Sequence, residues 1–535
     1  MIRIGNASGF YGDRSAAWRE MLEGGPLDVL TGDYLAELTM LILGRDRLKD
    51  PSLGYARTFL RQMEECLGLA AERGVRIVTN AGGLNPAGLA TALRSLAARL
   101  GLSTSIGYVE GDALDRPGAL AANAYLGAFG IASCLTAGAD VVVTGRVTDA
   151  SLVVGPAIAH YGWTRDDLDA LAGATVAGHV LECGAQATGG NFSFFTELPD
   201  GGRRPGFPIA EVHADGSAVI TKHPGTGGAV TVETVTAQLV YEIAASAYPG
   251  PDVVTHLDTV RLAQEAPDRV RVTGTRGTPP PPTLKVGVAG IDGHRNAMTF
   301  VLTGLDLDAK AALVRTQLED AVGKEGLTFT VTETAGGALL NAAIHDPDPK
   351  RAGRAFSSAA VELALASYPG CTLTTPPTDA TPHTIFTTEE LPQPPHWAVP
   401  PNGTRIEIPP PARTEPLIRE LVDEHAARHA HQLPDQPQGW RGRVGTRSGD
   451  KGVDANVGVW VRRAEDYAAL AGWLTGERFV ELLPEAAGHP VERYELPNLG
   501  ALNFVVRGLL ARRDWLDPQG KALGERLRAR IEEGP

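Results

Sequence analysis

A strand-then-turn pattern recurs five times in the first third of this chain and constrains its fold more than any other feature. Each time, a short apolar or β-branched run ends at small or polar residues, and a segment with helical spacing follows. The clearest run is Val141–Val143, which ends at Thr144-Gly145 and leads into Leu152–Val154. The other runs are 2–4, 28–30, 75–78 and 104–106. Such alternation predicts an α/β fold with a mostly parallel N-terminal sheet and flanking helices.

Polar residues follow these runs, and in a parallel sheet they would share one edge. Ligands of open α/β sheets bind beyond the carboxyl ends of the strands. Each of these side chains alone is more typical of a helix N-cap, and Thr148 or Asp149 is expected to cap the helix after Val143. Together the set favours a ligand crevice. Its predicted members are Asn6, Ser8, Asp33, Asn80, Gly82, Gly83, Asn85, Asp112, Arg146 and Asp149.

Charge and cysteine content narrow the class of protein. A net charge of -14 over 535 residues argues against a nucleic-acid binder. The 4 cysteines stand far apart, which fits a reduced, cytoplasmic protein without a disulfide framework. Residues 117–139 carry no charged side chain, but their alanine and glycine content predicts a buried helix, Gly118–Ala137, rather than a membrane span.

Changes in proline content and in the pattern of predicted strands and helices along the chain suggest its domains. Residues 1–370 read as one α/β domain, with a sheet-and-helix core over 1–190 and a β-rich extension over 191–370 that includes a hairpin at Asp215-Gly216. Prolines crowd the stretch that follows, so 371–438 is expected to form a Pro-rich linker and a helix, Glu415–His431. Residues 439–535 alternate strands and helices, which predicts a small α+β domain.

The octet Gly445–Gly452 opens that last unit and is the most unusual in the chain. Its glycines could turn the backbone so that amides face an anion, with Arg447 and Lys451 adding positive charge. An ordinary hairpin turn explains the same residues. If the octet binds a ligand, the residues expected to do so are Arg447, Ser448, Gly449, Asp450, Lys451 and Gly452.

His179, Glu182 and Cys183 lie on neighbouring turns of a predicted helix. A carboxylate beside a thiol could serve proton transfer or nucleophilic attack. The simpler interpretation is a helix end with Gly184 at its C-cap and an inert, buried Cys183.

Three other stretches give weaker signals. The loop Gly5–Gly12 lies where a dinucleotide fingerprint would, but it is not GxGxxG, and Asp33 is the single acidic candidate for a ribose. The loop Pro224–Gly228 lacks a phosphate-binding pattern. Histidines 425, 429 and 431 lie on a polar segment typical of a solvated helix face, so no metal ligands are assigned.

Several motifs resemble the acyclic terpene utilisation protein A family over essentially the whole chain. They are TNAGGLNPAGLA at 79–90, VVVTGRVTDASLVVGPA at 141–157, GHVLECGAQATGGNF at 178–192, PGFPIAEVHADG at 205–216, YPGPDVVTHLD at 248–258 and RSGDKGVDANVGV at 447–459. The resemblance implies a ferredoxin-like C-terminal domain and a place in the breakdown of citronellol- or geraniol-type terpenes through branched acyl-CoA thioesters. It implies no agreed catalytic residues.

Three functional hypotheses follow. The first is an enzyme acting on a branched acyl-CoA by lyase, hydratase or isomerase chemistry, with Asp149 or Glu182 as base. Arg146 would pair with a substrate carboxylate or with Asp149, and Lys451 would stabilise an oxyanion or phosphate. The second is a non-catalytic ligand-binding or accessory subunit of an acyl-CoA carboxylase system, and the third is an NAD-dependent oxidoreductase. We expect a homo-oligomer that takes a small-molecule substrate, with a CoA thioester as the candidate, and an acyl-CoA carboxylase is the candidate protein partner. We assign no cofactor and expect no nucleic-acid or membrane partner.

Overall fold

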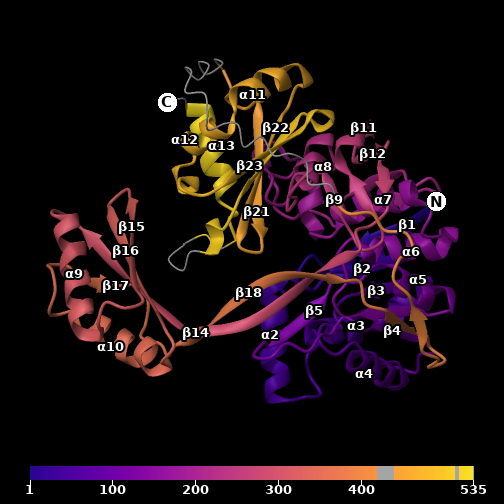
Figure 1. The fold of residues 1–535 in the computed structure, drawn as a ribbon, viewed down its shortest axis with the longest axis horizontal. Coiled ribbons are helices and arrows are strands. Elements are labelled where there is room, and N and C mark those ends of the chain that lie inside the picture. Colours follow the sequence, from indigo (N-terminus) through magenta and orange to yellow (C-terminus); the bar gives the residue numbers. More distant parts are fainter. Residues whose placement is uncertain (418–438, 512–516, 518, 534–535) are drawn as a thin grey trace.

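The computed structural model describes residues 1–417, 439–511, 517 and 519–533, and an 11-stranded sheet is its main element (Figure 1). The five predicted strands lie at its centre, mutually parallel, in the order β1-β2-β3-β6-β4. Their bounds are β1 Ile2–Asn6, β2 Val29–Gly32, β3 Arg76–Thr79, β6 Val141–Thr144 and β4 Ile106–Glu110. The predicted parallel sheet is therefore confirmed.

Antiparallel strands extend this sheet on both sides and carry it past residue 190. Beyond β1 lie β7 Pro208–Val212, β8 Ala218–Lys222, β12 Arg269–Thr273 and β11 Arg261–Ala266, and beyond β4 lie β19 His396–Val399 and β20 Ile406–Ile408. The predicted hairpin joins β7 to β8, with Gly216 at a φ of 81°. A small separate sheet holds β9 Ala247–Pro249, β10 Val254–His256 and β13 Arg276–Thr278.

Helices cover both faces of the parallel strands. One face packs on α5 Phe129–Thr136, α6 Ser151–Tyr161 and α7 Leu168–Leu181, and the other on α1 Ala17–Gly24, α3 Arg57–Arg73 and α4 Pro86–Arg99. Val142 points into the first of these cores, and its neighbours Val141 and Val143 point into the second. Burial on both faces explains why these strands read as unbroken apolar runs. Within the described part of the chain, no helix is long and apolar enough to span a membrane.

The single helix predicted over Gly118–Ala137 is wrong. The stretch forms the strand β5 Ala121–Ala124 and then the shorter helix α5. β5 pairs with β14, and the Asn123 side chain donates from Nδ2 to Asp112, 2.7 Å away. A buried amide needs such a partner, and a strand at this position provides one.

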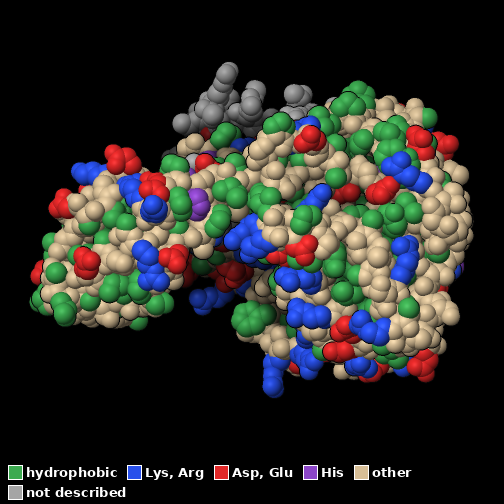
Figure 2. All heavy atoms as spheres, turned by 90° about the horizontal axis from the view of Figure 1, so that it is seen from below, with side chains coloured by type: hydrophobic (Ala, Val, Ile, Leu, Met, Phe, Trp, Pro, Cys, Tyr) green, Lys and Arg blue, Asp and Glu red, His purple; other side chains and the backbone are tan. Residues whose placement is uncertain are grey.

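A two-stranded arm leaves the main body and ends in a distal lobe (Figure 1). Its strands are β14 Thr283–Thr303 and β18 Thr381–Pro392. The lobe packs α9 Leu307–Val322 and α10 Phe356–Glu362 on one face of β14, β15 Leu327–Thr334, β16 Gly337–Asp346 and β17 Thr372–Leu373. Figure 2 shows the lobe as a projection joined to the body by a narrower neck.

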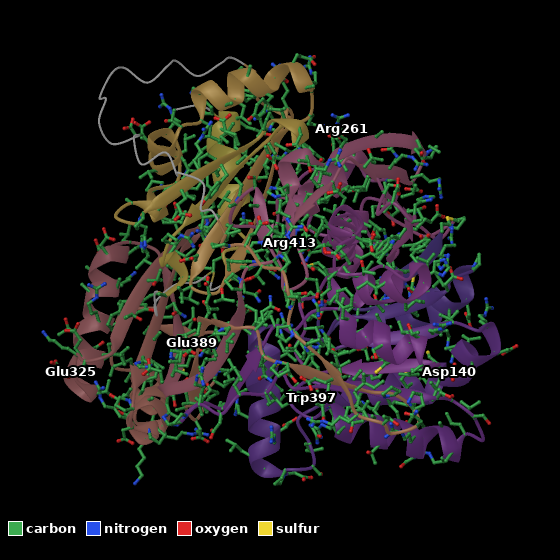
Figure 3. The ribbon with its side chains drawn as sticks, turned by 45° about the vertical axis from the view of Figure 1, so that its right-hand side comes forward. Asp140, Arg261, Glu325, Glu389, Trp397 and Arg413 are labelled. Carbon is green, nitrogen blue, oxygen red and sulfur yellow. The ribbon has the colours of Figure 1, made fainter. Side chains whose placement is uncertain are left out.

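These strands change the interpretation of residues 371–438. The described part of this stretch, up to residue 417, is not an open linker, because β17, β18, β19 and β20 all pair with strands of the lobe or body. In Figure 3, Glu389 marks β18 and Glu325 the far lobe. Glu389 accepts from Arg116 at 3.1 Å, which ties the arm to the body. Nearly all of the predicted helix Glu415–His431, with its histidines, lies outside the described residues.

The C-terminal unit is a four-stranded antiparallel sheet in the order β21-β22-β24-β23 with helices packed against it. Its elements are β21 Val444–Lys451, β22 Asp454–Val461, α11 Tyr467–Trp473, α12 Gly476–Leu482, β23 Val491–Leu496, β24 Ala501–Val506 and α13 Leu523–Glu533. The octet Gly445–Gly452 is mostly strand, and only Gly452, at a φ of 71°, lies in the turn to β22. The hairpin interpretation therefore describes its backbone.

Candidate active site

Asp33 lies buried at the carboxyl end of β2, held by residues from the neighbouring strands. Asn80, after β3, donates from Nδ2 to Asp33 Oδ1 at 2.6 Å, and its own oxygen accepts from the Tyr34 amide at 2.8 Å. Ser8, after β1, donates to the Asp33 carbonyl at 2.9 Å. Burial raises the pKa of Asp33 well above its ordinary value, Asp149 raises it further, and Arg146 opposes the rise. Asp33 therefore favours its protonated form.

Arg146, after β6, is buried and bridges to Asp149. Its Nη1 lies 3.0 Å from Asp149 Oδ1 and donates to the Leu35 carbonyl at 2.8 Å. Its guanidinium lies over the Tyr125 ring, 4.1 Å from the ring centre, and its backbone amide donates to Asp112 at 2.8 Å. Of the two roles predicted for Arg146, this structure contains the pairing with Asp149.

The expected N-cap by Thr148 or Asp149 is wrong. α6 begins at Ser151 after Ala150, and no side chain caps it. Thr148 instead lies 2.6 Å from Ser151, hydroxyl to hydroxyl. The Asp149 carboxylate is drawn to Arg146 because a full positive charge attracts it more than a helix end does.

His179 and Glu182 form a buried pair at the end of α7. His179 Nδ1 lies 2.9 Å from Glu182 Oε1. Burial raises the pKa of Glu182 well above its ordinary value, and Asp149 and Glu242 add to the rise, while Lys451 opposes it. Burial lowers the pKa of His179 to about 4. The imidazole is therefore neutral near pH 7, and the Glu182 carboxyl group holds a proton more readily than an exposed carboxyl group does.

The C-terminal unit brings Lys451 to this pair. Its Nζ lies 5.4 Å from the centre of the Tyr248 ring, and that ring lies 5.3 Å from the His179 ring. Arg447, also on β21, stacks on Tyr241 at 4.2 Å and donates to the Asn191 carbonyl at 3.1 Å. Arg447 thus anchors β21 to the body, whereas the positive charge of Lys451 lowers the pKa of both Glu182 and His179.

The sequence prediction missed two charged members of this cluster, Glu242 and Lys285. Glu242 has a left-handed φ of 55°, and its amide donates to Asn456 of β22 at 2.7 Å. Burial raises its pKa, and Lys451 opposes the rise. Lys285 on β14 lies 4.6 Å from the Tyr125 ring, and burial lowers its pKa. Each is a lone charge inside an apolar run, LVYEIA and TLKVGV, which was the available signal.

Other predicted ligand-binding residues lie in packing or turn contacts, so a ligand role for them stays a prediction. Asn85 caps α4 by accepting from the Gly88 amide at 2.9 Å, and Asn6 donates to the Leu181 carbonyl at 2.5 Å. Ser448 accepts from the Gly524 amide at 2.8 Å. The glycines among them permit close packing or a turn: Gly82 against β6, Gly83 against residues 43 and 54, Gly449 against residue 241, and Gly452 in its hairpin.

Two chemistries are disfavoured by the surroundings. Burial raises the pKa of the Cys183 thiol well above its ordinary value, which makes it a poor nucleophile. The loop after β1 packs so closely on residue 183 that a Cβ at Gly9 would lie 2.6 Å from its backbone carbon. A nicotinamide cofactor would place its pyrophosphate in this loop. Asp33, which would bind its ribose, already accepts from Asn80.

A surface hollow of about 480 Å³ lies elsewhere, between α5 and β20. Phe129, Arg165 and Ile408 are among its lining residues. It contains no pair of groups suited to proton transfer, so the cluster at the strand ends is the stronger candidate.

The fold and the cluster define an α/β protein in which a second, smaller domain brings Lys451 to a buried group of ionisable side chains. Comparison with protein families identifies it further. Residues 2–117 and 114–394 match the acyclic terpene utilisation family protein AtuA, and residues 444–531 match the AtuA ferredoxin-like domain. The chain belongs to this acyclic terpene utilisation family, as its motifs predicted. A comparison with curated proteins finds no match.

Proposed function

We propose that this protein is an acid–base enzyme of acyclic terpene breakdown that acts on a branched acyl-CoA by lyase, hydratase or isomerase chemistry. The observation that carries the proposal is the buried His179–Glu182 pair, 2.9 Å apart, beside Lys451 from the other domain. A carboxyl group whose pKa is raised by burial can both give and take a proton near neutral pH. We place the reaction in the cytoplasm.

Glu182 is the proposed general acid–base group, and His179 its positioning residue. Lys451 would stabilise negative charge that develops on the thioester oxygen when a proton leaves the neighbouring carbon. Asp149, the other predicted base, forms an ion pair with Arg146. These two residues would therefore position the surrounding carboxyl groups rather than take a proton from the substrate. Burial raises the pKa of Asp33 and of Glu242, so each carries negative charge less readily than an exposed carboxyl group and would repel an anionic intermediate less.

The proposal is tested by hydrogen exchange into a panel of branched, terpenoid-derived acyl-CoA thioesters in D2O, followed by mass spectrometry. We expect wild-type protein to add deuterium to at least one thioester, because general acid–base catalysis at carbon exchanges its protons with solvent. Glu182→Gln should slow this exchange by about 10²–10⁴-fold. Glu197→Gln is the matched control, since Glu197 is exposed and pairs with Arg462 at 2.7 Å.

Full exchange by Glu182→Gln would contradict the assigned role of Glu182. No exchange or turnover by the wild-type protein, combined with stable co-purification with an acyl-CoA carboxylase, would favour the accessory-subunit hypothesis instead. Protection of the fold by NAD in thermal unfolding, without protection by any thioester, would favour the oxidoreductase.

A further inference from the structure

Two histidines and an aspartate meet where the arm joins the distal lobe, and none of the three belongs to the acid–base cluster. One ligand atom from each of Asp292, His345 and His383 can be chosen so that all lie within 4.8 Å of one another. The Asp292 carboxylate Oδ2 lies 3.5 Å from His345 Nε2 and 4.0 Å from His383 Nδ1. The two imidazole rings are nearly perpendicular, at 82°, with centres 4.7 Å apart.

The backbone builds this arrangement from three strands. β14 pairs with β18 up to Ile291, its register shifts, and its pairing with β16 begins at His294. Asp292 lies inside this irregularity, and Gly293 beside it has a φ of 71°. Bulges of this kind re-aim side chains and are often found at functional sites. Here the bulge directs the Asp292 carboxylate toward β16 and β18.

The donor set has the chemistry and dimensions of a metal site. Two imidazole nitrogens and one carboxylate oxygen are a ligand set found in catalytic zinc sites and in non-haem iron sites. Around a tetrahedral ion with bonds of about 2.1 Å, ligand atoms lie about 3.4 Å apart. The distances of 3.5 and 4.0 Å therefore need only a small contraction.

We propose that Asp292, His345 and His383 bind a divalent transition-metal ion such as Zn²⁺ through three protein ligands, leaving coordination open to water or a small anion. His345 Nε2 lies 2.5 Å from the Asp292 carbonyl, to which it donates when protonated. On binding, the ring proton moves to Nδ1 and the Nε2 lone pair turns to the ion. The ion would cross-link β14, β16 and β18 and so stiffen the junction between the arm and the distal lobe.

Isothermal titration of the full-length, chelator-treated protein with Zn²⁺ tests this site. We expect one Zn²⁺ per chain at this site and a rise in the thermal midpoint on binding. His345→Gln and His383→Gln should each weaken binding by at least about 100-fold, the upper end of what loss of an outer-shell partner costs. Circular dichroism of both variants checks that the fold persists.

Matched variants separate this site from other histidines. His294→Gln, two residues from Asp292 with its Nδ1 3.3 Å from the Pro347 carbonyl, should bind Zn²⁺ as wild type does. A His425→Gln, His429→Gln double variant should also keep the site. The proposal is overturned if wild-type protein binds no Zn²⁺, if both ligand variants bind it unchanged, or if His294→Gln weakens it equally. None of these results depends on acyl-CoA turnover.

Discussion

Arg146 shows how one buried positive charge can stabilise a cluster of carboxyl groups. Asp33, Glu182 and Asp149 lie near one another, and the buried guanidinium opposes the rise in the pKa of the first two. Tyr125 covers one face of the guanidinium at 4.1 Å. The desolvation of Arg146 is thus offset by an ion pair, a carbonyl and an aromatic ring. Its positive charge reduces the cost of placing several carboxyl groups close together.

Asp450 gives a pH-dependent test at the residue scale. Burial, with Glu242 next in effect, raises its pKa from 3.8 to about 7. Between these two pH values the folded chain binds more protons than the unfolded chain, so this group lowers the free energy of unfolding as pH rises. Asp450→Asn removes that loss. Urea unfolding should therefore show the variant gaining stability relative to wild type from pH 4 to about 7, and no further change above.

Asp50→Asn is the control, because its stability relative to wild type should change with pH in the opposite direction. A hydrogen bond from Ser52 lowers the pKa of Asp50, so wild-type stability from this group grows as pH rises through its acidic range. Parallel pH curves for wild type and Asp450→Asn would contradict the assignment for Asp450.

The hairpin of β21 and β22 is the element on which the site most depends. It carries Lys451 toward the proposed acid–base pair, His179 and Glu182, and its docking on the body requires residues without side chains. A Cβ at Gly449 would collide with the Tyr241 ring, and one at Gly458 with Val240. Gly449 and Gly458 therefore permit close approach between the two domains.

Gly449→Ala should disturb this docking. We expect a loss of about 1–3 kcal/mol in the free energy of unfolding, the usual cost of overpacking. Because the same shift moves Lys451, acyl-CoA exchange should fall as well. Gly472→Ala in α11, where a Cβ would meet nothing within 4 Å, should leave exchange unchanged and should not lower the free energy of unfolding, since alanine favours a helix more than glycine does. Equal effects of the two substitutions, measured by urea unfolding, would count against the docking role.

At the scale of the whole molecule, polar side chains join the C-terminal domain to the body. Asn503 on β24 donates to the Ile243 carbonyl at 3.2 Å and the Ala244 carbonyl at 3.1 Å. Its own side-chain oxygen accepts a hydrogen bond from Asn456 Nδ2. Asn456 in turn accepts from the Glu242 amide. The interface therefore fixes the left-handed conformation of Glu242, so strain at the site depends on a neighbouring domain.

Asn503→Ala should uncouple the two parts. It leaves backbone carbonyls and the Asn456 side chain buried without this partner, at a cost of about 1–3 kcal/mol for each unsatisfied group. Calorimetry should show one transition for wild type and a broadened or divided transition for the variant. Asn402→Ala, in an exposed turn, is the control. A single unshifted transition for Asn503→Ala would show that the asparagine does not couple the domains.

The sequence by itself determined the parallel strands and their polar ends, because β-branched runs broken by glycine turns report local backbone preference and burial on both faces. It also indicated Asp33, Arg146, Asp149, Glu182 and Lys451, which follow strands or lie beside distinctive turns.

Tertiary structure alone decided which of these residues meet. The split of Gly118–Ala137 into strand and helix depended on β14, whose paired residues lie more than 160 positions further along the chain. Glu242, Lys285 and the Asp292–His345–His383 cluster each depend on contacts between distant segments, which no local periodicity encodes. The raised pKa of Glu182 arises in the same way, because burial is a property of the assembled fold rather than of neighbouring residues along the chain.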